Sequence, residues 1–183
     1  MFEVNNHKLK GAKWCMSPNY NERPSQEINL LVIHNISLPP NEFGGSYIED
    51  FFCNQLDCSA HDYFKEIENL EVSAHLLIKR TGDVVQFVPF DKRAWHAGVS
   101  EFNGSENCND FSIGIELEGA DDVPFESCQY DVLAQVTQAL QKAYPAIEIS
   151  RIVGHSDIAP GRKTDPGPHF DWPRYTSTLR SNS

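Results

Sequence analysis

A short apolar run near residue 30 constrains the fold most. Residues 28–36 carry Ile, Leu and Val at both odd and even positions. Successive side chains of a strand point to opposite faces, so this pattern is typical of a strand that is covered on both faces. It predicts a central strand of an α/β sheet. His34 and Asn35 follow the run directly and should lie at the tip of that strand.

Periodicity predicts the other elements. β-rich runs predict strands at residues 73–79, 84–88, 111–118 and 149–153, the first two forming an antiparallel hairpin. A period near 3.6 predicts helices at 47–56, 127–144 and 171–179. Residues 57–70 show only a weak pattern and are predicted to form a long loop that borders the active site. We therefore predict one α/β domain over 29–180, with a central mixed sheet flanked by helices, and an irregular lead-in over 1–28 packed on it.

Composition narrows the class of protein. A chain of 183 residues suits one compact domain. Lys and Arg number 15 against 26 Asp and Glu, a formal charge of -11, which argues against a general nucleic-acid binder or a binder of anionic membranes. Five cysteines without a Cys-x-x-Cys pattern argue against a disulfide framework, and the first ten residues do not resemble a secretory signal. We expect a cytoplasmic monomer, with a processed secreted protein as the alternative.

A loop rich in Pro and Gly, residues 154–168, carries polar side chains that are common in active sites. His155 follows an apolar β-like run, as His34 does, and Asp165 lies ten residues further on. Two imidazoles and one carboxylate form a known catalytic zinc arrangement in which an open fourth position can hold a water molecule. The alternative is that each histidine is a strand-end residue bonded to nearby backbone.

The predicted strand at 111–118 has one unusual face. Ser112, Gly114 and Glu116 alternate with apolar residues, and two of these three side chains are very small. The space beside Glu116 suits a pocket floor, where the carboxylate could act as a general base. A solvated carboxylate on the sheet face is the alternative, and Glu118 on the same face is given a supporting role.

Several motifs together resemble a known family. They are His34-Asn35, Ser73-Ala74-His75, Trp95-His96-Ala97-Gly98, Ser112-Ile113-Gly114-Ile115-Glu116, Gly154-His155 and Lys163-Thr164-Asp165-Pro166-Gly167-Pro168. Their order is similar to that in the zinc-dependent N-acetylmuramoyl-L-alanine amidases, which are related to phage lysozyme-type amidases and peptidoglycan recognition proteins. Longer matches at 32–40, 88–100 and 108–119 resemble the cytoplasmic branch that acts on 1,6-anhydro-muropeptides. The resemblance covers roughly residues 14–175.

The resemblance implies a reaction and its residues. One zinc ion would be held by His34, His155 and Asp165, the last standing where many relatives outside this branch use cysteine. Glu116 would be the general base, and Lys163 would stabilise the oxyanion, with Arg162 as the local alternative. The reaction would be hydrolysis of the amide between the lactyl group of muramic acid and L-alanine in a small muropeptide, during cell-wall recycling.

Weaker assignments complete the expected site. The resemblance places substrate-binding residues in or near the cleft, namely Asn35, Tyr63, His75, Trp95 and His96. Trp95 as a core residue and His75 as a satisfied strand histidine are equally compatible with the sequence. Glu71 and Asn107 stand where some close relatives carry basic residues. A non-catalytic peptidoglycan-binding module and a zinc hydrolase of another amide remain the rival functions.

Overall fold

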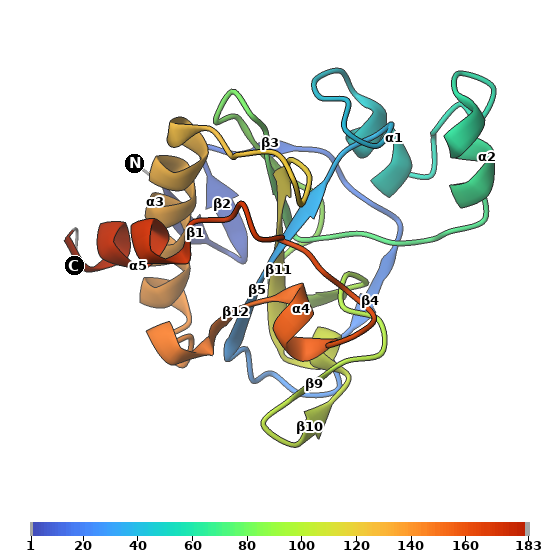
Figure 1. The fold of residues 1–183 in the computed structure, drawn as a ribbon. Coiled ribbons are helices and arrows are strands. Elements are labelled where there is room, and N and C mark those ends of the chain that lie inside the picture. The colour runs from blue at the N-terminus through green and yellow to red at the C-terminus, as the bar shows by residue number, and fades with distance from the viewer. Residues whose placement is uncertain (1, 182–183) are drawn as a thin grey trace.

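A six-stranded mixed sheet forms the centre of the molecule (Figure 1). The computed structural model describes residues 2–181. The sheet order is β12–β5–β11–β6–β7–β3, and within it β6 and β7 pair antiparallel while the other neighbours are parallel. The sheet strands are β3 (Lys13–Trp14), β5 (Leu30–Ile36), β6 (Leu76–Ile78), β7 (Val84–Gln86), β11 (Ser112–Glu118) and β12 (Ile152–Gly154). The predicted mixed sheet is confirmed.

Helices and short strand pairs surround this sheet. The helices are α1 (Tyr47–Phe52), α2 (Asp62–Ile67), α3 (Ser127–Ala143), α4 (His155–Ile158) and α5 (Trp172–Ser181), with 3₁₀ turns at Cys108–Asp110 and Ile149–Arg151. The outer strands are β1 (Glu3–Asn5), β2 (Lys8–Lys10), β4 (Tyr20–Glu22), β8 (Lys92–Ala94), β9 (Glu101–Phe102) and β10 (Ser105–Glu106). Within the described range, no helix combines the length and the apolar character needed to cross a membrane.

The two central strands, β5 and β11, run parallel over their whole lengths. Their register places Ser112 beside Leu30, Gly114 beside Val32 and Glu116 beside His34. Every residue of β11 and the first five of β5 are buried. Burial on both faces confirms the central strand predicted from the apolar run. The register brings His34 and Glu116 onto one face.

Helices cover each face of the sheet. On one face, α3 packs its buried side chains Leu133, Val136 and Leu140 against alternate sheet residues, and α5 lies beside it. The N-terminus of α3 is fixed by Gln129, whose side-chain oxygen accepts a hydrogen bond from the Glu126 backbone N–H at 3.0 Å. The helices predicted at 127–144 and 171–179 are confirmed.

The other face carries α1 and α2 and, from β5 and β11, the side chains of His34 and Glu116. Phe51, Phe52 and Phe64 of these helices pack with Leu77 and Val85, which lie on the sheet face opposite to α3. Figure 1 shows α1 and α2 on the side of the sheet away from α3 and α5. The loops at the carboxyl ends of the parallel strands β5, β11 and β12 meet at one edge of the sheet. A ligand site is expected at that edge.

The N-terminal lead-in is not irregular, contrary to the prediction. It forms β1 to β4, and β3 extends the main sheet by pairing with β7. Buried Arg23 donates hydrogen bonds to the backbone carbonyls of Phe90, Asn109 and Ser112. Strands of two or three residues are too short for alternation to reveal them, which explains the error.

Other boundaries also differ from the predictions. The helix predicted at 47–56 ends at Phe52, and the strand predicted at 73–79 spans only Leu76–Ile78. The segment predicted as a loop at 57–70 contains α2, whose first turn is capped by His61 Nδ1 accepting from the Tyr63 N–H at 3.1 Å. The strand predicted at 149–153 begins as a 3₁₀ turn, and the loop at 154–168 opens with the one-turn helix α4. One helical turn gives no periodic signal, so the Pro and Gly content dominated the sequence pattern.

Candidate metal centre and active site

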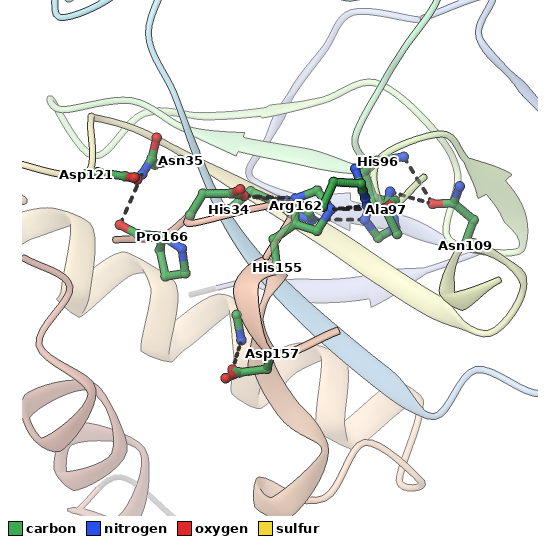
Figure 2. Close-up of polar contacts among 12 residues, drawn as sticks. His34, Asn35, His96, Ala97, Asn109, Asp121, His155, Asp157, Arg162 and Pro166 are labelled. Carbon is green, nitrogen blue, oxygen red and sulfur yellow. Dashed lines mark hydrogen bonds and ion pairs between the residues drawn. The ribbon is translucent and has the colours of Figure 1, made fainter. Parts of the chain in front are cut away.

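Three side chains from distant parts of the chain converge at the carboxyl end of β5. His34 lies near the end of β5, His155 opens α4, and Asp165 follows ten residues later. The Nδ1 atoms of the two histidines are 3.0 Å apart, and each is 3.0 Å from Asp165 Oδ2. The sequence therefore predicted a real cluster, and Figure 2 shows two of its members, His34 and His155, close together.

The opposite nitrogens of both imidazoles are already engaged. His155 Nε2 lies 3.0 Å from the Ala97 carbonyl oxygen, which can only accept, so Nε2 carries the proton and Nδ1 presents its lone pair. His34 Nε2 lies 2.9 Å from His96 Nδ1. Metal-ligating histidines commonly bond their second nitrogen in this way.

The geometry of the cluster fits a zinc ion. Three atoms separated by 3.0 Å can all reach one ion at about 2.0–2.1 Å, the usual Zn–N and Zn–O distance. Two lone pairs and one carboxylate oxygen this close repel each other unless a proton or a cation lies among them. The donor set is thus compatible with a metal ion held by three protein ligands.

The protonation states also suit a metal. Burial lowers the pKa of His34 to about 4, with the hydrogen bond to Asp165 opposing this shift. Burial alone would raise the pKa of Asp165, but its close contacts with His155 and His34 lower it below its ordinary value. The cluster therefore offers a neutral imidazole and an ionised carboxylate near neutral pH, the forms that bind metals.

Glu116 faces the cluster from the neighbouring strand. Its register opposite His34 puts both side chains on the same face of adjacent strands. The carboxyl group is buried, and its Oε2 has no hydrogen-bond partner within residues 2–181. Burial raises the pKa of Glu116 well above its ordinary value, and the nearby Asp165 charge adds to this while Lys163 opposes it. An unpaired buried oxygen in a cleft is available to a reacting molecule.

The space beside Gly114 is filled, contrary to the open pocket floor that the sequence suggested. The His96 ring lies over this residue, and a Cβ at position 114 would come within 2.5 Å of the ring. His96 Nε2 is 3.2 Å from Ser112 Oγ. The Asn109 side chain accepts from the His96 N–H at 3.1 Å and so fixes the segment that delivers the ring. Small residues on β11 thus make room for a histidine that contacts His34.

Lys163 and Arg162 have different surroundings. Lys163 is exposed and lines the same cleft as Glu116 and Asp165. Arg162 instead donates to the carbonyls of Ala97 and Val99 at 2.6 and 2.7 Å, beside Nε2 of His155. Of the two cations, Lys163 is the one that faces the cleft.

The cleft has an apolar wall that sequence reasoning missed. The predicted residues Asn35, Tyr63, Trp95 and His96 line it together with the metal cluster, Glu116 and Lys163. The opposite wall consists of side chains from α1, α2 and the loops around them, namely Leu38, Phe51, Phe52, Ile67, Leu70 and Val72. The apolar residues of α1 were visible in the sequence, but nothing in it placed them opposite the histidines.

His75 does not line the cleft, although it was expected in or near it. The residue is fully buried, its Nδ1 accepts from the Gly114 N–H at 3.0 Å, and its Nε2 lies 3.0 Å from the Lys92 carbonyl oxygen. Both ring nitrogens are therefore satisfied by backbone. Glu71 and Asn107 also lie outside this cleft, on separate hollows of the surface.

Comparison with known proteins identifies the family. The family model described as N-acetylmuramoyl-L-alanine amidase matches residues 24–168. The chain belongs to this family. It is 58% identical over 168 residues to the 1,6-anhydro-N-acetylmuramyl-L-alanine amidase AmpD of Escherichia coli K12, an alignment that covers 91% of each chain. The membership predicted from the motifs is confirmed.

Solved structures agree with this membership. A crystal structure of a selenomethionine derivative of AmpD matches with a TM-score of 0.94 and 54% identity, covering 96% of this chain and 98% of that one. AmpDh3 from Pseudomonas aeruginosa, solved in complex with an anhydromuramic pentapeptide, matches with a TM-score of 0.61 and 31% identity, covering 85% and 61%. The α/β fold and the amidase class predicted from the sequence are confirmed.

Proposed function

We propose that the protein hydrolyses the amide between the lactyl group of 1,6-anhydro-N-acetylmuramic acid and L-alanine in muropeptides released during cell-wall recycling. The observation that carries the proposal is the buried Glu116 carboxyl group facing the cluster of His34, His155 and Asp165 in one cleft. The high identity to AmpD, whose name states this amide, supports the choice of substrate.

One zinc ion is proposed as the cofactor, held by His34, His155 and Asp165. Bound zinc polarises a carbonyl group and lowers the pKa of water. The protein residues would orient the ligands and the substrate and would transfer the proton. His96 and the Ala97 carbonyl orient the two imidazoles, since each contacts the Nε2 atom of one ligand.

Glu116 is proposed to move the proton. A carboxyl group whose pKa is raised by burial can take a proton from the attacking water and return it to the leaving amine nitrogen near neutral pH. Lys163 is proposed to stabilise the negative charge that develops on the carbonyl oxygen, because its ammonium group lies on a flexible stem at the rim of the cleft.

The walls of the cleft are proposed to bind the sugar of the substrate. The half-buried rings of Trp95 and Tyr63, together with the apolar wall, can pack against the sugar and exclude water. The Trp95 ring is fixed because its Nε1–H donates to Asn21 Oδ1 at 3.1 Å. We also propose a cytoplasmic location, which the odd set of five cysteines supports.

Glu116→Gln tests the proposal. Release of the stem peptide from a 1,6-anhydro-muropeptide, followed by mass spectrometry, should fall by roughly 10²–10⁴-fold, while zinc stoichiometry stays unchanged. Near-wild-type release by this variant would contradict the general-base assignment. Parallel reactions with a non-anhydro muropeptide and simple peptides identify the bond, and chelation tests the metal. Wild-type binding without any cleavage would favour the peptidoglycan-binding module instead.

A further inference from the structure

Asn35 makes contacts that determine which end of its amide faces the cleft. Its Nδ2 atom lies 2.7 Å from Asp121 Oδ1 and 3.0 Å from the Pro166 carbonyl oxygen, as Figure 2 shows. Both neighbours accept hydrogen bonds, since neither a carboxylate oxygen nor a carbonyl oxygen carries a proton. The nitrogen must therefore point toward them, and the reverse orientation of the amide is excluded.

The oxygen end of this amide is left for the cleft. Both protons of Nδ2 are used, and within residues 2–181 no protein group donates to Asn35 Oδ1. Asn35 lines the cleft next to the metal ligand His34. The side chain thus presents an acceptor, and it suits a substrate group that donates, such as a peptide N–H.

Asp121 is itself held in place by the loop that carries Asp165. A Cβ on Gly167 would come within 2.4 Å of the Asp121 Cα, so the two backbones are in close contact. The Asp121 carbonyl also accepts from the His169 N–H at 3.4 Å. With its backbone fixed on this loop, the carboxylate is a stationary acceptor for Asn35.

We propose that Asp121 is a positioning residue that orients the Asn35 amide, so that Oδ1 accepts a hydrogen bond from a peptide N–H of the substrate. The inference rests on the proposed amidase function and adds a residue that the sequence motifs do not include. Because Asn35 contacts the substrate in the ground state and in the transition state alike, its loss should raise KM and leave kcat unchanged.

Exchange of the two side-chain types tests the pairing. Asn35→Asp places a carboxylate against Asp121 and against the Pro166 carbonyl, and should raise KM for a 1,6-anhydro-muropeptide at least tenfold. The double variant Asn35→Asp with Asp121→Asn restores a donor–acceptor pair and still offers an oxygen to the cleft. Because the new carboxylate still faces the Pro166 carbonyl, KM should recover only in part, to at least threefold below that of Asn35→Asp.

Single variants of Asp121 complete the experiment. Asp121→Ala should raise KM roughly 3–10-fold with kcat and zinc stoichiometry unchanged, whereas Asp121→Asn, which can still accept, should remain near wild type. Asp122→Asn is the matched control, because Asp122 is exposed and makes no hydrogen bond to Asn35 among the described residues.

Two results would overturn the inference. One is a double variant as impaired as Asn35→Asp. The other is an Asp121→Ala enzyme that loses zinc and thermal stability with KM unchanged, since that is the signature of a merely structural role. Wild-type turnover is measured first. An absence of peptide release by the wild type would contradict the proposed function, whereas normal release with unaltered KM in Asp121→Ala would contradict only the role of Asp121.

Discussion

Gly114→Ala should weaken zinc binding without touching a metal ligand. The new Cβ would lie 2.5 Å from Cγ and Nδ1 of His96, whereas ordinary contacts begin at 3.4 Å. The ring must therefore retreat by about 1 Å, a displacement that is large for a hydrogen-bonded site. His96 Nδ1 is 2.9 Å from His34 Nε2, so this retreat breaks the contact that orients His34.

The expected size of the effect follows from these contacts. Loss of a group that orients a metal ligand typically costs 10–100-fold in metal affinity, or about 1.4–2.7 kcal/mol. Overpacking of the buried strand should also lower the free energy of unfolding by about 1–3 kcal/mol. Competition with a chromophoric chelator measures the zinc affinity, and urea unfolding measures the stability.

Gly119→Ala is the matched control for this variant. Its Cβ would meet the Phe125 ring at 2.4 Å, an equally severe overlap on the α3 side of the molecule. It should lose stability to a similar extent and keep the wild-type zinc affinity. The reasoning is refuted if Gly114→Ala binds zinc within twofold of wild type, or if Gly119→Ala weakens zinc binding as much.

Three other measurements address the remaining features of the site. Burial holds the pKa of His75 near 3 in the folded state, below the ordinary 6.5, so stability is lost as pH falls below 6.5. Between pH 7 and pH 5 wild type should lose about 2 kcal/mol more than His75→Asn, whereas the exposed-site control His169→Asn should parallel wild type. Lys163→Ala should lower kcat by roughly 10²–10³-fold and retain zinc. A change in KM alone, with kcat intact, would contradict its role. Zinc removal should reduce hydrogen-exchange protection more in residues 154–168 than in α3, and equal protection in apo and zinc forms would count against this.

The parts of the fold that were predictable are those with long, regular patterns. The apolar run of β5 and the alternation in β11 each extend over seven residues, and the stripe of α3 extends over four turns. His34 could be placed near the carboxyl end of β5 because the continuous apolar run stops just before it. The pairing of His34 with Glu116 could not be predicted from the sequence. The register between two parallel strands depends on connections that no local pattern encodes.

The environment of each site residue was less predictable than its identity. The small residues Ser112 and Gly114 were interpreted as empty space, whereas the His96 ring fills it from a segment 16 residues or more away in sequence. His75 belongs to a motif that resembles the family, but its nitrogens bond the backbone of Gly114 and Lys92. Motif membership alone thus does not separate a residue that supports a site from one that faces it.

The metal ligands in the Pro- and Gly-rich loop are brought together by backbone contacts as well as by any ion. The Ser156 N–H donates to the Asp165 carbonyl at 3.0 Å, directly beside His155. At the start of α4, the Gly154 N–H donates to Asp157 Oδ2 at 2.7 Å. These bonds place the imidazole and the carboxylate of the loop side by side before zinc arrives, so less ordering entropy opposes its binding. Residues 156–164 lie between the two proposed ligands, so the removal of a bound ion should loosen this segment most.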